Sequence, residues 1–577
     1  MAFHIKFGSP EKIIPSLFCK GFNYRESEIR YDVNKITFKQ NARGCVLEFP
    51  VRKEERFYGL GLQLKTFDLT GKKLVSRVNA DPISDNGDSH APVPFFVSNY
   101  GYGVYFDTAR YAEFEFGRQK NDIFSDADLR SDETNDDKVK TSTEELYAIR
   151  NVAENSVVSV QIPVAKGIDV YIFEGKTITD VVKEYNMLSG GGCTVPEWGL
   201  GVYYRCYGSS DQKNVEKTID YFFDKKMPLS VVGLEPGWQT AAYPCSFKWN
   251  KDRFADPKKF VNGIYDKNLH INLWEHAFTS FQSDIYGDLK KYSGNYLVWN
   301  GLVPDFAIEE ARDIFAGYHK NNVTFDRIDG FKIDECDGSD YTGSWTFPLC
   351  SEFPSGMDGE QYHSLFGTLY MQTVLQILGE KPTYSEARNA GALAASYPFA
   401  IYSDLYDYRD FIRGLCSAGL SGVLWTPEVR HADSAEEFLK RLQLVVFSPQ
   451  CLINGWYCED LPFIKFGIEK EVKYWLDERI KLIPRLKRAF KLYKQKGKPV
   501  VRPLVGDYTF DKEVYSIDDE FLLGEDLLVA PAFLGQDGRE IYLPRGEWED
   551  YFTAEKVQYG RFTVKTDRIS VFVKKDV

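Results

Sequence analysis

Two aspartates stand where short apolar runs of the chain end, a position suited to acid–base or nucleophilic chemistry. Asp334 closes the run Gly330–Asp334, and Asp404 closes the run Ala400–Asp404. A carboxylate directly after apolar residues is costly to bury without a partner. Two carboxylates at one site suit glycoside hydrolysis, in which one attacks the anomeric carbon or activates water and the other protonates the leaving oxygen. For either aspartate alone, a salt bridge or a helix N-cap is the competing interpretation.

Other chemistries fit the residue pattern less well. The acidic segment Asp334–Asp337 could hold a cation, but His276 has no second histidine at a metal-ligand spacing, and an HExxH motif is absent. A GxSxG elbow for acyl transfer is also absent. We therefore expect neither a metal nor another cofactor at this site.

The elements that must position the aspartates lie between about residues 195 and 460. Short apolar strands alternate there with amphipathic stretches, which is typical of a parallel α/β fold. A doubly wound sheet is the alternative, but the Gly-rich loop that would favour it after the first strand is missing. Eight strands predict a (β/α)8 TIM barrel with its site at the carboxyl ends of the strands. The expected strands are Gly201–Arg205, Ser230–Glu235, His270–Trp274, Gly330–Asp334, Thr383–Glu386, Ala400–Asp404, Gly422–Trp425 and Cys451–Asn454.

The barrel is flanked by two regions with β-strand patterning. Residues 1–190 predict an N-terminal β-sandwich, residues 191–497 the catalytic barrel and residues 498–577 a short C-terminal β-sandwich domain. The segment Ile468–Lys496 predicts one or two helices, and the charged segment Asp126–Asp137 predicts a solvated surface loop.

The composition of the chain limits the classes of molecule that it could bind. Its 577 residues carry 71 Lys plus Arg and 84 Asp plus Glu, a net charge of −13, which argues against a general nucleic-acid binder. No uncharged apolar run approaches the roughly 18 residues of a membrane span. The first residues lack the apolar core of a signal peptide. Ten cysteines without a CxxC pair are read as reduced thiols of a cytoplasmic protein. A homo-oligomer is left open.

Longer motifs resemble those of one known family. Phe57–Gly61 (FYGLG), Pro92–Asp107 and Phe521–Pro531 (FLLGEDLLVAP), followed by YLPRGEW, are similar to segments of the α-glycosidases of glycoside hydrolase family 31. The resemblance covers nearly the whole chain. It implies a retaining exo-α-glycosidase that acts on a small oligosaccharide or glycoside through a covalent glycosyl-enzyme.

The same resemblance implies roles for individual residues. Phe331–Asp337 (FKIDECD) resembles the family segment that carries the nucleophile, so the nucleophile would be Asp334. Asp404 follows Arg388 at the family's spacing, which implies that Asp404 is the general acid/base and that Arg388 contacts the sugar. A general acid must hold a proton at the start, so we expect a raised pKa for Asp404. Two other readings of Asp404 are a cap for the helix from Tyr408 and an ion pair with Arg409. The family segment ends in Glu where this chain has Asp337, and no role is carried over to that position.

Departures from the family's α-glucosidase pattern bear on the sugar. Glu235 stands where an Asp usually binds the 4- and 6-hydroxyls of glucose, Lys332 replaces a Trp, and Asn454 replaces a His. These changes make an α-galactoside the leading expectation, with an α-glucoside or α-xyloside as the alternative. The expected substrate-binding residues are Asp81, Glu235, Trp274, Lys332, Arg388, Trp425 and Asn454, and Trp238 is a further aromatic at a strand end.

Two other outcomes share this scaffold. A transglycosylase or a glucan lyase would use the same nucleophile. A carbohydrate-binding protein without activity is the hypothesis from another class, and the presence of both Asp334 and Asp404 argues against it.

Overall fold

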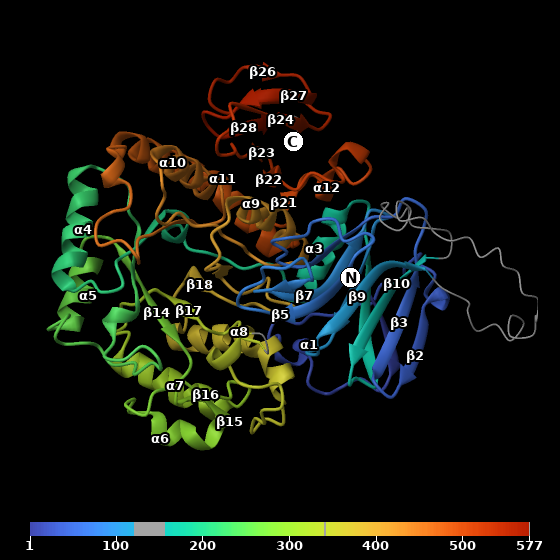
Figure 1. Cartoon of the computed structure of the whole chain (residues 1–577), viewed down its shortest axis with the longest axis horizontal. Helices are drawn as coiled ribbons and strands as arrows, with labels where there is room; N and C mark the ends of the chain where they lie inside the picture. Colours follow the sequence, from blue (N-terminus) through green and yellow to red (C-terminus); the bar gives the residue numbers. More distant parts are fainter. Residues whose placement is uncertain (120–155, 340–341, 576–577) are drawn as a thin grey trace, which may run out of the picture.

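The N-terminal region of the computed structural model folds as two β-sheets packed face to face (Figure 1). The structure describes residues 1–119, 156–339 and 342–575, so the segment Asp126–Asp137 lies outside the described residues. One sheet has the order β1 (Phe3–Gly8), β11 (Gly167–Glu174), β8 (Tyr102–Asp107), β7 (Pro92–Ser98), β4 (Phe57–Gly61). The other has the order β2 (Thr37–Asn41), β3 (Gly44–Pro50), β10 (Ser156–Pro163), β9 (Ala112–Gln119), β5 (Lys73–Val78), β6 (Asp88–Ser89).

Alternation of side chains builds the core of this sandwich. In β3, Cys45, Leu47 and Phe49 are buried while the residues between them are partly exposed, as expected for a strand with one face on a core. Gly61 ends β4 with φ +86°, and a Cβ there would lie 2.0 Å from the carbonyl oxygen of Ala91. The glycine therefore lets β4 and the chain before β7 approach each other closely.

The central region is a parallel barrel. Its hydrogen-bonded strands have the order β19 (Phe399–Ile401), β18 (Ser385–Ala387), β17 (Gly330–Asp334), β14 (His270–His276), β13 (Val231–Leu234), β12 (Val202–Arg205), β20 (Cys451–Asn454). The predicted strand Gly422–Trp425 is reduced to single bridges. Trp425 bridges Ile401, and Val429 bridges Ile453, so this segment lies between the two edges of the sheet and closes the barrel. The predicted TIM barrel is thereby confirmed.

Helices surround the barrel in the predicted order. They are α4 (Gln212–Asp224), α5 (Pro257–Tyr265), α7 (Glu309–Asn322), α8 (Gly359–Leu378), α9 (Tyr408–Ser417), α10 (Ala435–Val446) and α11 (Glu469–Lys496). Five of them begin at a side chain that accepts a backbone N–H, as N-caps do: Asp211, Asp256, Asp358, Asp407 and Ser434. Between β14 and β17, the helix α6 (Tyr286–Leu289) precedes a hairpin of β15 (Ser293–Val298) and β16 (Gly301–Pro304).

The C-terminal region is a smaller β structure that lies above α9, α10 and α11 in Figure 1. One sheet has the order β21 (Val501–Pro503), β22 (Phe521–Leu523), β23 (Leu527–Ala530), β28 (Ser570–Lys574), β25 (Trp548–Asp550), β26 (Lys556–Val557). The strands β24 (Gly538–Leu543) and β27 (Gly560–Lys565) form a second sheet. The segment predicted as one or two helices is the single helix α11, with Pro484 inside it.

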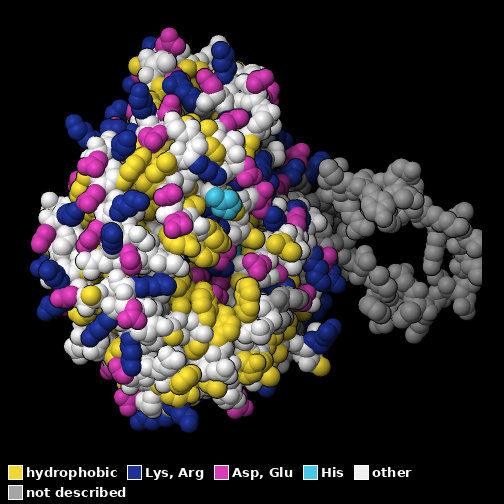
Figure 2. Space-filling view, turned by 60° about the vertical axis from the view of Figure 1, so that its left-hand side comes forward, with side chains coloured by type: hydrophobic (Ala, Val, Ile, Leu, Met, Phe, Trp, Pro, Cys, Tyr) yellow, Lys and Arg dark blue, Asp and Glu magenta, His cyan; other side chains and the backbone are white. Residues whose placement is uncertain are grey.

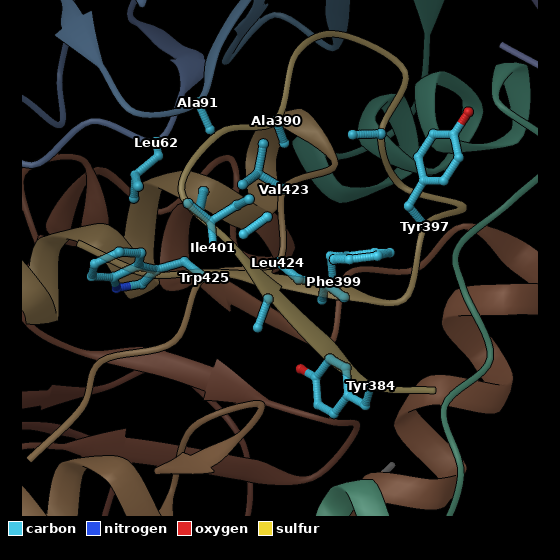
Figure 3. Packing of buried hydrophobic residues seen from close by; sticks show 14 of the residues in the cluster. Leu62, Ala91, Tyr384, Ala390, Tyr397, Phe399, Ile401, Val423, Leu424 and Trp425 are labelled. Carbon is cyan, nitrogen blue, oxygen red and sulfur yellow. The ribbon is translucent and has the colours of Figure 1, made fainter. Parts of the chain in front are cut away.

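Hydrophobic packing joins the sandwich to the barrel. Figure 3 shows Leu62 and Ala91, from the sandwich, beside Ile401 and Ala390 of the barrel. The contact is also polar, because the backbone N–H of Gly61 donates to Ser421 Oγ at 3.0 Å. The sandwich is therefore fixed on the barrel, and the chain between β5 and β7 is held beside the carboxyl ends of the barrel strands.

Two further observations concern the described residues. No helix among them has the length and apolarity needed to cross a membrane. All ten cysteines are free thiols, as predicted.

Candidate active site

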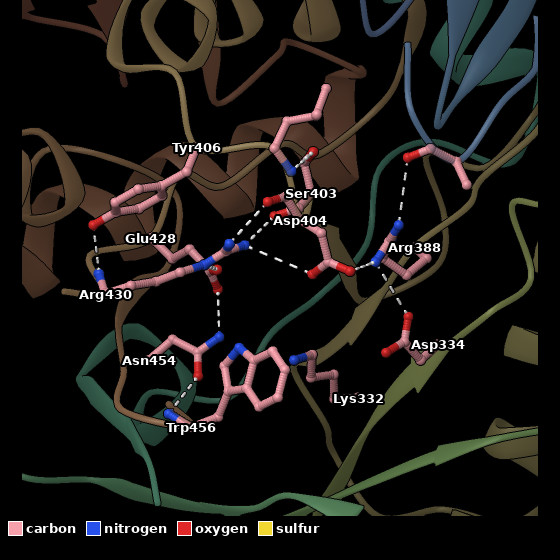
Figure 4. A network of polar contacts seen from close by, with 12 residues as sticks. Lys332, Asp334, Arg388, Ser403, Asp404, Tyr406, Glu428, Arg430, Asn454 and Trp456 are labelled. Carbon is pink, nitrogen blue, oxygen red and sulfur yellow. Dashed lines mark hydrogen bonds and ion pairs between the residues drawn. The ribbon is translucent and has the colours of Figure 1, made fainter. Parts of the chain in front are cut away.

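Asp334 and Asp404 meet at the carboxyl ends of β17 and β19, where one guanidinium nitrogen bridges them. Arg388 Nη1 lies 3.4 Å from Asp334 Oδ1 and also donates a hydrogen bond to Asp404 Oδ2 (Figure 4). Arg388 follows β18, the strand between β17 and β19. Three adjacent strand ends thus bring together Asp334, Arg388 and Asp404, the residues to which the resemblance assigned roles in the reaction.

Asp334 is held firmly. Its Oδ2 accepts a hydrogen bond from Trp274 Nε1 at 2.7 Å, and its Oδ1 accepts one from the backbone N–H of Glu335 at 2.9 Å. Burial raises the pKa of Asp334 above its usual value, although the charge of Arg388 opposes this. The side chain is only 9% exposed, so its free lone pairs face a confined space.

Asp404 differs from Asp334 in both exposure and charge. Its side chain is 47% exposed, and a second guanidinium, that of Arg430, lies 3.7 Å from its Oδ1. Burial of the carboxyl favours the neutral form, but the neighbouring cations, Arg388 first, outweigh it and hold the pKa of Asp404 well below its usual value. The raised pKa expected for this residue is therefore wrong.

Both alternative readings of Asp404 are also wrong. The helix α9 is capped by Asp407, whose side chain accepts the backbone N–H of Asp410. Arg409 pairs with Asp518 and with Asp519. Asp404 is thus left facing the other carboxylate instead of supporting a helix.

Glu335 adds a third acidic group that the sequence reasoning did not select. Its backbone adopts a left-handed conformation with φ 54°, and its side chain is half-buried. Burial, reinforced by the charge of Asp334, raises the pKa of Glu335 to about 9. A neutral carboxylic acid therefore lies next to the candidate nucleophile at neutral pH. The sequence signal that could have identified Glu335 is its position directly after Asp334, as the second of two consecutive acidic residues at a strand end.

Asp337, to which no role was carried over, contacts Arg388. Asp337 Oδ2 accepts hydrogen bonds from Arg388 Nε at 3.1 Å and from His90 Nδ1 at 2.9 Å. His90 comes from the sandwich and was not predicted. The carbonyl oxygen of Ala80 accepts from Arg388 Nη2 at 3.4 Å. The predicted residue Asp81 follows Ala80, so its loop does reach the site, with the Asp81 side chain exposed to solvent.

The floor of the site is a buried ion network at the ends of β12, β13 and β17. Arg205, which is fully buried, pairs with Glu235 and, at 2.7 Å, with Glu386. Lys332 Nζ lies 3.5 Å from Glu235 Oε1 and 4.7 Å from the centre of the Tyr402 ring. Glu235 and Lys332, both predicted, are therefore close to each other. Arg205, which neutralises Glu235, was not predicted.

A second network joins the ends of the closing segment and β20. Asn454 Nδ2 donates to Glu428 Oε2 at 3.1 Å, and Glu428 pairs with Arg430. Arg430 also donates to the carbonyl oxygens of Ser403 and, at 2.9 Å, Asp404 (Figure 4). Asn454 is thus placed beside the site, and its link to Asp404 runs through Glu428 and Arg430.

Of the three tryptophans expected at strand ends, one contacts the nucleophile, one lies behind it and one faces away from the pocket. Trp274 touches Asp334, as described above, whereas Trp238 lies behind it, with Trp238 Nε1 donating to the Trp274 carbonyl at 2.6 Å. Trp425 is not brought to the pocket, because its indole N–H donates to the Phe411 carbonyl on α9 at 3.1 Å and its ring packs edge-on against Phe411. Since the strand there is reduced to a bridge, its alternation did not predict the side of the barrel that Trp425 faces.

Two half-exposed tyrosines stand at the rim. Tyr243 is 52% and Tyr457 is 51% exposed; partial burial raises the pKa of both, and the negative charge of Asp404 adds to the rise. Tyr243 packs on Trp274 at 5.5 Å and on Trp299 at 5.0 Å between ring centres. Figure 2 shows acidic side chains in a recess bordered by hydrophobic ones. Such a recess offers carboxylates at its base and aromatic faces at its edge, an arrangement that suits a sugar.

The described ranges contain no group of three His, Cys, Asp or Glu side chains arranged to hold a metal ion. The side chains gathered at the site are carboxylic acids, guanidinium groups and the ammonium group of Lys332.

Comparison with known families gives matches along the chain. The glycosyl hydrolase 31 N-terminal galactose mutarotase-like domain matches residues 25–115, the glycosyl hydrolases family 31 TIM-barrel domain matches residues 193–489, and the glycosyl hydrolase family 31 C-terminal domain matches residues 497–577.

Curated relatives are similar at low identity. The α-xylosidase XylQ of Lactiplantibacillus pentosus is 22% identical over 88% of this chain and 65% of its own length. The α-xylosidase of Emericella nidulans is 22% identical, covering 92% of this chain and 67% of that protein. The α-glucosidase 2 of Bacillus thermoamyloliquefaciens is 23% identical, covering 93% and 69%. The chain thus spans about two thirds of the length of these relatives.

Solved structures show the same fold. The GH31 dextranase of Flavobacterium johnsoniae, complexed with glucose, has a TM-score of 0.78 at 21% identity and covers 94% of this chain and 68% of its own. A GH31 sulfoquinovosidase from E. rectale, in complex with an aza-sugar inhibitor, has a TM-score of 0.76 at 19% identity and covers 94% and 86%.

Proposed function

Because the chain belongs to glycosyl hydrolase family 31, we propose that it is a retaining exo-α-glycosidase that removes terminal α-linked sugars. The observation that carries this proposal is the bridge from Arg388 Nη1 to both aspartates. Two oxygens that contact one nitrogen in this way lie no more than about 6 Å apart, on the side of the retaining separation of about 5–5.5 Å and short of the inverting one of about 6.5–9.5 Å.

The proposed reaction is a double displacement. Asp334, oriented by Trp274 and the Glu335 amide, attacks the anomeric carbon while Asp404 gives a proton to the departing oxygen. Asp404 then takes a proton from the water that hydrolyses the glycosyl-enzyme. Two inversions at one carbon return the α configuration.

Asp404 needs a proton before the first step, whereas the neighbouring cations favour its ionised form. The cation that lowers the pKa of Asp404 most is Arg388, which also contacts Asp334. In this proposal the bound sugar separates Arg388 from Asp404, and the loss of that contact raises the pKa of Asp404 enough for it to act as an acid.

For the sugar we propose an α-xyloside or an α-glucoside in place of the α-galactoside first expected. The similar curated proteins include α-xylosidases and α-glucosidases, and nothing among the comparisons supports α-galactosidase activity. The galactoside expectation depended on a shifted carboxylate at Glu235. Arg205 and Lys332 form ion pairs with this carboxylate and hold it in place. It therefore cannot move to bind a 4-hydroxyl of the opposite configuration.

A panel of p-nitrophenyl glycosides tests the proposal. We expect turnover of the α-xyloside or α-glucoside, and proton NMR of the first product should show the α anomer. A β anomer would contradict the retaining mechanism, and a faster α-galactoside would contradict the sugar assignment. Absence of turnover on every α-glycoside would favour the non-catalytic carbohydrate-binding hypothesis. Transfer to a second sugar, or an unsaturated product, would identify a transglycosylase or a lyase.

A further inference from the structure

His90 belongs to the sandwich, yet its ring lies among the barrel residues that surround the two aspartates. It stands between β6 and β7, and none of its side chain is exposed. His90 Nδ1 lies 2.9 Å from Asp337 Oδ2, and His90 Nε2 lies 2.7 Å from Ser403 Oγ. Its carbonyl oxygen accepts a hydrogen bond from Asn389 Nδ2 at 2.7 Å. One residue of the sandwich thus contacts the chain after β17, β18 and β19.

The hydrogen-bond partners determine the direction of each contact. Asp337 is ionised, since Arg388 and His90 hold its pKa below the usual value against the effect of burial. A carboxylate only accepts, so His90 Nδ1 carries the proton that it donates. Ser403 Oγ accepts the backbone N–H of Leu405 at 3.0 Å and can donate its own proton to His90 Nε2. Both nitrogens of the imidazole therefore have a hydrogen-bond partner.

The two side-chain partners of His90, Asp337 and Ser403, are each adjacent to a residue of the proposed reaction. Asp337 Oδ2 also accepts from Arg388 Nε at 3.1 Å, and Arg388 presents its Nη1 to Asp334 and Asp404. On the other side, Ser403 directly precedes Asp404. Removing the imidazole would leave Asp337 Oδ2 with Arg388 as its remaining partner and the Ser403 hydroxyl proton without its acceptor, and both side chains could then move.

We propose that His90 is a positioning residue through which the N-terminal domain aligns Arg388 and Asp404 for the reaction. This inference rests on the proposed glycosidase function and adds to it a requirement for a residue outside the barrel. The effect should concentrate on proton donation, because Ser403, which His90 contacts, directly precedes the acid Asp404. Misplacement of a reacting group by about 1 Å costs on the order of 100-fold in rate.

Three variants of His90 in the full-length chain test the inference with a series of aryl α-glycosides whose leaving groups range from good to poor. His90→Ala removes both contacts. His90→Asn places an amide N–H where Nδ1 stood and keeps the contact with Asp337, whereas His90→Gln places one nearer Nε2. We expect His90→Ala to lower kcat about 100-fold for poor leaving groups and under about 10-fold for good ones, with KM changed little. His90→Asn should recover most of the lost rate, and His90→Gln less.

The matched control is another histidine–aspartate pair at the opposite end of the barrel. His270 begins β14, and its Nδ1 lies 3.0 Å from Asp329 Oδ2. His270→Ala should change the melting temperature without changing the dependence on the leaving group. Should His90→Ala fail to fold, the comparison of His90→Asn with His90→Gln still decides.

The two proposals fail in different ways. Loss of rate that is equal for all leaving groups, equal in the Asn and Gln variants, or shared by His270→Ala would overturn the role of His90 while leaving the glycosidase intact. A wild-type chain that turns over no α-glycoside would overturn the proposed function itself.

Discussion

Replacing Lys332 by methionine should raise the pKa of Asp334, and the size of the effect follows from the strand that carries both. Lys332 and Asp334 lie two residues apart on one face of β17, so their Cα atoms are about 6.6 Å apart at the rise of a parallel strand, and this spacing sets the scale for the attraction between their charges. Opposite charges at that distance attract by about 2.5 kcal/mol at an effective dielectric constant of about 20. We therefore expect the pKa of Asp334 to rise in Lys332→Met, since the charge of Lys332 lowers it in the structure.

The sign of the effect on activity follows from the role of the nucleophile. Asp334 must be ionised to attack, so activity is lost as the pH falls through its pKa. A higher pKa moves this acidic limb of kcat/KM to higher pH. The measurement uses an aryl glycoside with a good leaving group, so that protonation by Asp404 contributes little. Because Glu335 titrates nearby, the comparison is repeated in a Glu335→Gln background.

The variant should remain folded, and a control separates charge from stability. Glu235 keeps its partner Arg205 in Lys332→Met, and methionine occupies most of the space of the aliphatic chain. Lys440 on α10 is equally buried, with 4% of its side chain exposed, and pairs with Glu436. Lys440→Met should leave the acidic limb of the kcat/KM pH profile unchanged. An acidic limb that stays in place, or moves to lower pH, in Lys332→Met would refute the reasoning.

Three further outcomes follow from the site. Asp404→Ala should lower kcat/KM by about 10²–10⁴-fold for poor leaving groups and far less for activated ones, and steady-state kinetics that show equal losses would contradict an acid role. Arg205→Met leaves Glu235 and Glu386 buried without their shared cation, and should lower the free energy of unfolding by about 3–5 kcal/mol at pH 7. Because the folded-state pKa values of the two carboxyls then rise, urea denaturation at pH 5 should show a smaller loss, and an equal loss would argue against charge burial. Tyr243→Ala should raise KM for aryl glycosides about 3–10-fold with little change in kcat, and an unchanged KM would remove Tyr243 from the binding site.

Several features were predictable because they depend on neighbouring residues. Runs of apolar residues between amphipathic stretches located seven of the eight barrel strands, and the segment predicted as helical, Ile468–Lys496, is the helix α11. The position of Asp334 and Asp404 after such runs placed them at one end of the barrel, because all strands of a parallel barrel point the same way. The remaining strand, Gly422–Trp425, is reduced to single bridges, and Trp425, which the resemblance placed in the pocket, contacts α9 instead.

By itself the sequence determined which residues could react, since residue type, the apolar run before it and its matched motif are all local. Only the tertiary structure decided their charge states and supports. The contacts of His90 join residues 247 and 313 positions apart, and no local pattern records them. The low pKa of Asp404 results from cations on three other strand ends, Arg388, Arg430 and Lys332, whose distances exist only once the barrel has closed. A pKa is a sum of interactions over space, and that sum is set by the fold.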